Sequence, residues 1–434
     1  MRPSGISIVV LTLMTVLAGA AAFSDGMAVI WKAAAAAVTG WFCLDFYLGT
    51  RLPDMELKRT VKHSLPVGAW SKVVLEFKNL DARMILIKAH DHHPEDCHCK
   101  GLPLELALPQ GKRLKTFYDI RPFKKGDMVF GRIDLFIRSP LALWWRKETC
   151  GKTEAVKVLP NFRQIKNYTL LAADNRLSRI GILKKPRRGE GNDFHQLRDY
   201  RAGDPFRQID WNKTSRYLKL ITKEYQDERD QQILFLLDCG RRMRHADDRD
   251  THFDQALNAM LLLCHVALKQ EDAVGFMVFG GIQKWFPPRK NVNTIRHILN
   301  QVYTLHPTTE AADYLSAAKS LATLQKKRSL VIILTNTRDE DFDDLLGAVK
   351  VLKKKHLVVL ADLREKIIDE TMAQNVTDLD SAVLYHALTD YRERLNKNHR
   401  ALSHHGIISI NTLAEALPAR LVNEYLNVKA SGKL

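Results

Sequence analysis

Two apolar segments open the chain. Residues 6–23 (ISIVVLTLMTVLAGAAAF) carry no charged side chain, and these 18 residues are about the length that a helix needs to cross the hydrocarbon core of a bilayer. Residues 27–48 carry only Lys32 and Asp45, each near an end from which its charge can reach the lipid headgroups. The pattern predicts two transmembrane helices, arranged as a hairpin, over residues 1–50.

Basic residues flank this hairpin at both outer ends. Arg2 precedes the first apolar segment, basic residues from Arg51 onward follow the second, and the intervening turn offers only Asp25. Because positive residues stay on the cytoplasmic side, we expect a multi-pass protein of the bacterial inner (plasma) membrane with both termini in the cytoplasm. A signal peptide cleaved near the small residues AGAAAF is the alternative, which would place the rest of the chain outside. The six cysteines lack a regular spacing and are typical of reduced cytosolic thiols, which opposes that alternative.

Residues 51–160 alternate between apolar and polar side chains with a period of two. In KVVLEFK the apolar positions are Val73, Leu75 and Phe77. About seven short runs of this kind, separated by Pro, Gly and Asp, predict a small Ig-like β-sandwich. We find no catalytic arrangement of residues in this part of the sequence.

One stretch of the predicted sandwich, HDHHPEDCHC, is rich in residue types that bind metals. Its histidines and cysteines are His90, His92, His93, Cys97, His98 and Cys99. Their spacing matches no standard zinc finger or zinc ribbon. We therefore expect adventitious metal binding or none in this stretch.

The pattern changes in residues 231–434, where apolar strands alternate with amphipathic helices. The predicted strands cover residues 232–238, 272–280, 329–337, 356–363 and 406–410. This alternation predicts a doubly wound α/β domain with a mostly parallel sheet. Functional groups of such sheets gather at the carboxyl ends of the strands, where Asp238 and Asn336 are the candidates.

This layout resembles the von Willebrand factor A domain. In that family three loops build a metal site: Asp-x-Ser-x-Ser after the first strand, a Thr in the second loop, and an Asp after the fourth strand. The matching positions in this chain are Asp238, Gly240 and Arg242, then Thr308 or Thr309, then Asn336. Only one of the carboxylates that the resemblance implies is present.

The residue at the second serine position opposes cation binding. Arg242 brings a positive charge to the place of the cation, and two like charges about 4 Å apart repel by roughly 4 kcal/mol at an effective dielectric constant near 20. We therefore expect that the fold is kept without its metal and that the protein uses no cofactor. A metal-dependent von Willebrand factor A binding module remains the alternative.

The net charge of +17 favours a negatively charged partner, such as nucleic acid, an acidic protein or anionic lipid. The basic stretch LKKPRRGEG (residues 183–191) suits lipid more simply than nucleic acid beside a membrane. The sequence contains no nucleophile elbow, no His-Glu-x-x-His and no complete P-loop. A hydrolase built on Asp238 and His245 stays open, but a non-enzymatic protein without a small-molecule substrate is the prediction.

The most distinctive run is GEGNDFHQLRDYRAGDPFRQIDWNKTSRYLKLITKEYQDE (residues 189–228). It resembles the signature of the family named domain of unknown function fifty-eight (DUF58), and Pro140-Leu141-Ala142-Leu143 resembles that family's Pro-x-Gly-Leu turn with Ala142 in place of glycine. The resemblance brings no known activity, but it implies association with MoxR-type AAA+ ATPases. The signature positions in this chain are Asp193, Phe194, Arg198, Tyr200, Gly203, Asp204, Arg207, Asp210 and Trp211.

Two surfaces of residues 161–434 can serve the implied partner. We interpret residues 161–230 as an ion-paired connector, with Trp211 and Phe194 packed at its seam, rather than as a docking surface. The docking surface is instead predicted at the strand ends, where arginines have few acids directly beside them: Arg241, Arg242, Arg244 and Arg338. The chain is thus predicted to be a membrane adaptor for an AAA+ ATPase.

Overall fold

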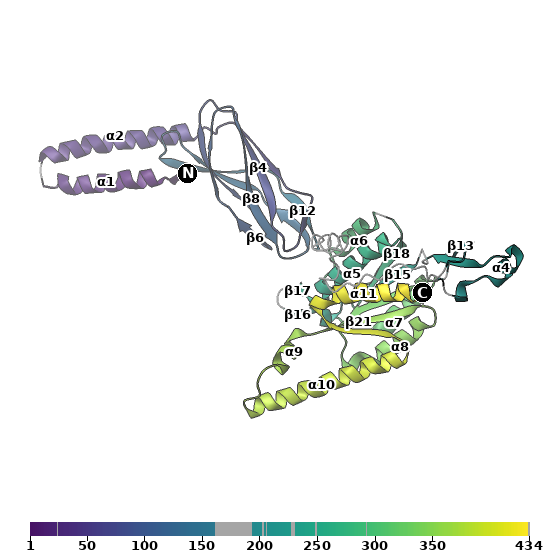
Figure 1. Cartoon of the computed structure of the whole chain (residues 1–434). Helices are drawn as coiled ribbons and strands as arrows, with labels where there is room; N and C mark the ends of the chain where they lie inside the picture. Colours follow the sequence, from purple (N-terminus) through teal and green to yellow (C-terminus); the bar gives the residue numbers. More distant parts are fainter. Residues whose placement is uncertain are drawn as a thin grey trace. The chain divides into compact units, whose positions relative to one another are not determined.

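A computed structural model describes residues 1–23, 25–160, 193–201, 204, 206–226, 231–247, 250–291 and 293–432, with backbone alone at residues 193–195 and 224–226. Three members of the family signature therefore lie wholly or in their side chains outside the described residues: Gly203, Asp193 and Phe194. The chain divides into two compact units, Met1–Leu159 and Pro160–Leu434 (Figure 1).

The first unit begins with two antiparallel helices, α1 (Gly5–Ala21) and α2 (Asp25–Gly49), which lie side by side (Figure 1). The Trp31 indole Nε1 donates a hydrogen bond of 3.2 Å from α2 to the Met14 carbonyl oxygen of α1. Among the described residues, α2 is the one helix that is long and apolar enough to cross a membrane, and α1 is a shorter apolar helix. The two predicted helices are therefore present, and the apolar character of α2 associates the chain with a membrane.

Asp45 does not reach toward lipid headgroups as predicted. Its buried carboxylate lies against the turn between two strands of the sandwich and accepts hydrogen bonds from Ser139 Oγ (2.5 Å), Leu141 N (2.8 Å) and Leu143 N (2.9 Å). Ser4 of the amino end also contacts this turn, because its hydroxyl donates to the Ala142 carbonyl oxygen at 2.6 Å. The turn at residues 139–143 thus holds the bases of both helices.

Ala142 occupies the position at which the family pattern has glycine. Its φ is +69°, a left-handed conformation that glycine adopts at little cost and that other residues adopt rarely. The sequence pattern and the backbone geometry therefore agree on the shape of the turn.

The remainder of the first unit is a β-sandwich whose sheets enclose one core, which includes Phe77, Tyr118 and Phe130. The alternating burial along β4 agrees with the predicted period of two. One sheet has the order β2 (Met55–Thr60), β4 (Ser71–Asn79), β8 (Arg113–Pro122), β6 (Cys97–Lys100). A second sheet has the order β1 (Arg2–Pro3), β11 (Trp144–Cys150), β10 (Ile133–Arg138), β5 (Ile85–Asp91), β7 (Leu104–Leu108). A third sheet has the order β3 (Ser64–Pro66), β12 (Glu154–Leu159), β9 (Gly126–Phe130).

The second unit contains a six-stranded sheet in the order β19 (Lys284–Arg289), β18 (Ala273–Phe279), β15 (Gln232–Asp238), β20 (Leu330–Thr335), β21 (Leu357–Arg364), β22 (Ile408–Leu413). All neighbouring pairs are parallel except β18 and β19. The chain leaves β15 for β18 on one side and later returns beside β15 as β20. This switch in strand order opens a crevice at the carboxyl ends of β15 and β20.

Helices cover both faces of this sheet, as the alternating pattern predicted. Ile233, Phe235 and Leu237 pack in the core formed with α5 (His252–Lys269), α6 (Thr294–Val302) and α11 (Leu417–Ala430). Leu234 and Leu236 point to the opposite core, formed with α7 (Tyr314–Leu324), α8 (Phe342–Lys353) and α10 (Leu379–His404). The short elements α9 (Lys366–Met372), η4 (Asp339–Asp341) and η5 (Ala414–Ala416) complete the domain.

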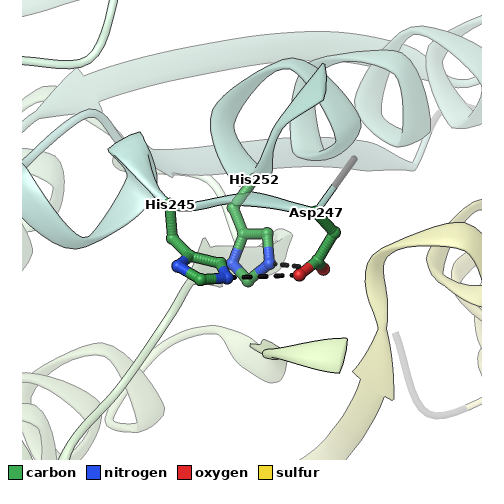
Figure 2. A group of neighbouring side chains, drawn as sticks. All are labelled: His245, Asp247 and His252. Carbon is green, nitrogen blue, oxygen red and sulfur yellow. Dashed lines mark hydrogen bonds and ion pairs between the residues drawn. The ribbon is translucent and has the colours of Figure 1, made fainter. Parts of the chain in front are cut away.

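The connection from β15 to α5 carries the single-turn helix η3 (Arg241–Arg244) and the strand pair β16 (Ala246–Asp247) and β17 (Asp250–Thr251). This strand pair places His245, Asp247 and His252 next to one another (Figure 2).

The described part of the family signature folds as a hairpin. Strands β13 (Asp193–Asp199) and β14 (Ile221–Gln226) pair antiparallel, and η2 (Phe206–Gln208) and α4 (Trp211–Tyr217) lie between them. Arg198 Nη1 and Nη2 each donate to one carboxylate oxygen of Asp204 at 2.8 Å. The Asp210 side chain accepts from the Lys213 amide and caps α4.

Within the described residues, Trp211 of α4 is 63% exposed. Phe206 (74%) and Leu218 (93%) are exposed as well, and Leu218 ends α4 with a φ of +54°. Arg207 is also exposed, and the Tyr200 ring stacks on Phe206. The signature hairpin therefore presents apolar side chains to solvent around its ion pair.

Candidate functional site

Asp238 ends β15 and is buried at the crevice where the strand order switches. Its carboxylate accepts hydrogen bonds from the Gly240 amide (2.7 Å) and from Thr335 Oγ1 (2.7 Å) at the end of β20. The Tyr314 hydroxyl forms a hydrogen bond with Thr335 Oγ1 at 2.7 Å and so extends this series of hydrogen bonds. Burial raises the pKa of Asp238 to about 6, against the opposing effect of these donors and of Arg242.

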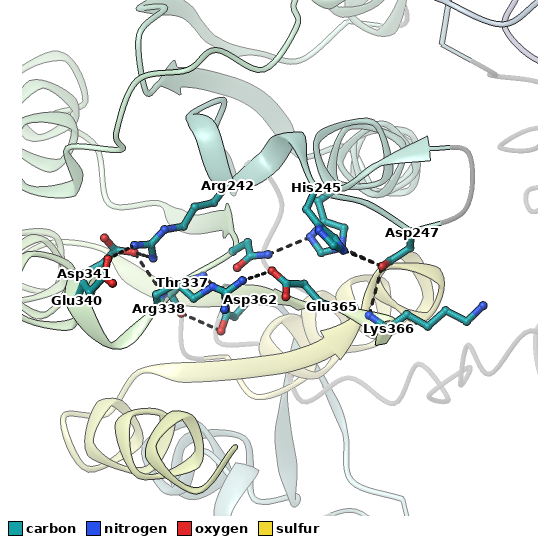
Figure 3. Close-up of polar contacts among 12 residues, drawn as sticks. Arg242, His245, Asp247, Thr337, Arg338, Glu340, Asp341, Asp362, Glu365 and Lys366 are labelled. Atoms are coloured by element: carbon teal, nitrogen blue, oxygen red, sulfur yellow. Dashed lines mark hydrogen bonds and ion pairs between the residues drawn. The ribbon is translucent and has the colours of Figure 1, made fainter. Parts of the chain in front are cut away.

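Arg242 turns its guanidinium toward the loop after β20 rather than toward solvent (Figure 3). Its Nη1 is paired with Asp341, and its Nη2 lies 2.9 Å from Glu340 Oε2. The Arg242 side chain is 17% exposed. The arginine at the position where the sequence resemblance implied a cation is therefore neutralised by acids of the same chain.

Arg338 is also paired, since its guanidinium contacts Glu365 at the end of the β21 connection (Figure 3). The prediction that the rim arginines have few acids beside them is therefore wrong for Arg242 and Arg338. Arg241 and Arg244 remain exposed on η3, and no ion pair of either is found among the described residues. These two residues are the part of the predicted rim that is available to a partner.

Gly240 leaves no room for the serine that the sequence resemblance implies at this position. A Cβ atom at this position would lie 2.9 Å from the Glu310 carbonyl oxygen and 3.1 Å from Asp238 Oδ1. Of the two threonines proposed for the second loop, Thr308 is the one in contact with this region: its amide donates to the Cys239 carbonyl oxygen, and its hydroxyl donates to Gly280 O at 2.7 Å. Thr309 is exposed.

The last residue of β20 and the two residues after it point in three directions. Thr335 binds Asp238, while Asn336 Nδ2 lies 3.1 Å from His252 Nδ1 and so faces α5 instead of Asp238. Thr337 donates through its amide and its hydroxyl to Asp362, the last buried carboxylate of β21. The structure thus brings Asp238, Gly240 and Arg242 together but not Asn336.

These contacts decide which ligands Asp238 can offer to a metal ion. The oxygens of Asp238 face hydroxyl and amide donors, and the nearest charge is a guanidinium, whereas magnesium requires several oxygen ligands and commonly one or two carboxylates. The Arg242 ion pair joins η3 to the loop after β20.

Sequence reasoning missed the acids that pair with the rim. Three consecutive acids, Asp339, Glu340 and Asp341, begin four positions after the end of β20 and were the available signal. It also missed the His-x-Asp pattern at residues 245–247 with His252 seven positions after His245.

The predicted His/Cys stretch of the sandwich is spread over separate contacts. Cys97 is buried with its thiol 3.5 Å from Met128 Sδ, and burial raises its pKa to about 11. His92 Nε2 lies 2.9 Å from Asp134 Oδ2. Among the described residues, the side chains of this stretch do not converge on one point as three metal ligands would.

A family model and one curated protein match part of the chain. The family model described as "Protein of unknown function DUF58" matches residues 196–405. The uncharacterized protein YeaD of Bacillus subtilis is 25% identical over 182 residues, which are 42% of this chain and 42% of that protein, so the match spans less than half of the relative's length.

Two solved structures are similar to parts of this chain. An aerotolerance-related membrane protein from Bacteroides fragilis has a TM-score of 0.29 and 14% identity and covers 45% of this chain and 98% of its own. An alpha-2-macroglobulin from Escherichia coli has a TM-score of 0.21 and 16% identity and covers 25% of this chain and 7% of its own. The resemblance expected from residues 189–228 is confirmed at the level of the family: residues 196–405 of this chain match protein of unknown function DUF58.

Proposed function

We propose that this protein is a non-enzymatic membrane adaptor whose second unit, a von Willebrand factor A-like domain without the metal of that family, binds a MoxR-type AAA+ ATPase. The observation that carries the adaptor role is the exposed apolar surface of the signature hairpin. The family resemblance supplies the class of partner. The internal neutralisation of Arg242 supports binding that requires no cation.

The docking surface lies, in this proposal, on the signature hairpin. Its exposed aromatic and aliphatic side chains are of the types that dominate the energy of protein interfaces. The same hairpin carries the exposed basic residues Arg207 and Arg216, which can select an acidic partner surface. We name the set Phe206, Trp211, Tyr217 and Leu218 the hairpin apolar surface.

The membrane helices place both soluble parts on one side in the proposed topology. Because α1 and α2 form a hairpin with basic residues outside it, both termini are expected in the cytoplasm. A reporter enzyme that is active only in the periplasm, fused after Leu434, is expected to stay inactive in the full-length protein. Activity of that fusion, or a mature amino terminus near Ala21, contradicts this topology.

Docking is tested by copurification from detergent-solubilised membranes. Replacing Trp211 and Leu218 together by serine is expected to reduce recovery of the ATPase at least tenfold, because the lost apolar area lies on the proposed interface. The melting temperature of the protein is expected to change little, since both side chains are exposed in the free protein. Leu379→Ser, at a position 78% exposed on α10, is the matched control and is expected to retain the partner.

The rim supplies the competing surface. Arg241→Glu with Arg244→Glu reverses its two available charges without breaking the Arg242 ion pair. Loss of the ATPase in this variant, with normal binding by the Trp211 and Leu218 variant, moves the interface from the hairpin to the rim. If neither variant alters an ATPase that copurifies, or no AAA+ ATPase copurifies, the proposed function is rejected.

A further inference from the structure

Three metal-binding side chains converge at the start of α5. Asp247 Oδ2 lies 2.9 Å from His252 Nε2, and Asp247 Oδ1 lies 3.2 Å from His245 Nε2 (Figure 2). One ligand atom from each of the three residues lies within 4.8 Å of the others. Asp238, Gly240, Arg242 and Thr335 do not belong to this group, which is therefore separate from the crevice around Asp238.

The backbone fixes the spacing of these side chains. The β16–β17 pair aligns Asp247 with Asp250, and the His252 amide donates to the His245 carbonyl oxygen at 2.7 Å. Thr251 caps α5 through a hydrogen bond from the Asp254 amide, which holds His252 in the first turn. The two imidazoles and the carboxylate are thus held together before any ligand arrives.

The observed separations suit a small cation. Zinc lies 2.0–2.1 Å from imidazole nitrogen and at a similar distance from carboxylate oxygen, so two ligands of a tetrahedral ion are roughly 3.3 Å apart. The separations of 2.9 Å and 3.2 Å between ligand atoms are close to that value. An ion can therefore replace the protons that the histidines share with Asp247 after small movements of the side chains.

The surroundings provide orientation on one side and access on the other. His252 is fully buried, and its other ring nitrogen, Nδ1, lies 3.1 Å from the Asn336 side-chain amide, which can accept an N–H bond after rotation of that amide. Such an outer hydrogen bond orients a ligating imidazole. The His245 side chain is 33% exposed, so a fourth position beside it can be filled by water or by a ligand.

We propose that His245, Asp247 and His252 form a site for one divalent ion of the zinc type, with one coordination position open. Two imidazole nitrogens favour such an ion over magnesium or calcium, which take oxygen ligands. The Asp247 carboxylate also accepts from the Lys366 amide at 3.3 Å, so this ligand joins the segment after η3 to the first residue of α9 (Figure 3).

The test uses the full-length protein in detergent, freed of metal with EDTA and titrated with Zn²⁺ against a chromophoric chelator. The wild type is expected to bind one equivalent more than His245→Ala and than Asp247→Asn. Co²⁺ is expected to give visible ligand-field absorption in the wild type that both variants lose. Asn336→Leu is expected to weaken Zn²⁺ binding by about 10–100-fold, because it removes the orienting hydrogen bond.

His404→Ala, an exposed histidine of α10, is the control and is expected to bind like the wild type. Metal-free melting temperatures verify that each variant is folded. His245→Ala is the variant whose folding is expected to change least, because the His245 side chain is partly in solvent. Zinc retained on the sandwich histidines adds equally to all variants. Equal stoichiometry and equal Co²⁺ spectra in the wild type, His245→Ala and Asp247→Asn overturn the proposal.

Discussion

Replacing Asp45 by alanine is expected to lower the stability of the first unit by about 3–6 kcal/mol, because hydrogen bonds to charged groups contribute about 1.5–3 kcal/mol each and buried donors left unpaired add to the loss. The carboxylate accepts from Ser139, Leu141 and Leu143, and the protein offers these donors no other acceptor among their described contacts. The melting temperature in detergent is expected to fall by roughly 10–20 °C.

Two further variants, Asp45→Asn and Asp54→Ala, serve as comparisons for this prediction. Asp45→Asn is expected to recover only part of the loss, since its amide nitrogen is a donor and would face donors. Asp54→Ala removes the same charge from an exposed position nearby in the sequence and is expected to leave the melting temperature almost unchanged. If Asp45→Ala melts with the wild type, the turn at residues 139–143 does not hold the helices as described.

Asp238→Asn is expected to stabilise the second unit, which is the opposite of what a metal-binding carboxylate would give. The folded pKa of about 6 lies above the ordinary value of 3.8, so folding takes up a proton between these values. The contribution of Asp238 to stability therefore falls as the pH rises from 4 to 6, and the cost is complete above about pH 6. A difference of about two pKa units corresponds to about 3 kcal/mol at 1.36 kcal/mol per unit.

Asparagine retains the hydrogen bonds of this position. Its oxygen can accept from the Gly240 amide, and its nitrogen can donate to Thr335 Oγ1. The gain of Asp238→Asn in denaturant unfolding is expected to be about 2–3 kcal/mol at pH 7.5 and about half of that at pH 5, with no response to millimolar Mg²⁺ in either protein.

Thr335→Val tests the same carboxylate and is expected to change stability in the opposite direction. Valine has the shape of threonine but removes the donor to Asp238 Oδ2, so this variant is expected to be less stable than the wild type, and more so at pH 7.5 than at pH 5. A loss of stability in Asp238→Asn at pH 7.5, or a Mg²⁺ response that only the wild type shows, means that the ionised carboxylate stabilises the fold or a bound ion.

Local patterns in the sequence predicted elements such as β4 and β15. They did not predict contacts between residues that lie far apart in the sequence. The period of two in β4 and the uninterrupted apolar run of β15 reflect which faces are buried, so the sequence alone identified them. Asp238 was placed at a strand end for the same reason. The partners of Arg242 follow β20, almost one hundred residues later, and only the strand order brings Glu340 and Asp341 beside η3.

Exposure was the second property that the sequence did not supply. A tryptophan beside a charged motif suggests a packed seam when its neighbours are unknown, because large aromatic side chains are commonly well buried. Among the described residues β13 and β14 pair only with each other, and Trp211 of the α4 helix between them is 63% exposed. For Asp45 the error was the opposite, because it was predicted to be exposed and is buried. An acid near the end of an apolar helix carries no local sign of the turn that binds it.

The bond from Ser139 to Asp45 also imposes an order on biosynthesis. These residues are 94 positions apart, so both apolar helices leave the ribosome before the turn that receives Asp45 has been made. At about 5–20 residues per second the interval is roughly 5–20 s. During that time the turn that binds Asp45 is absent, and the position of α2 relative to the sandwich is set only when the sandwich folds around the carboxylate.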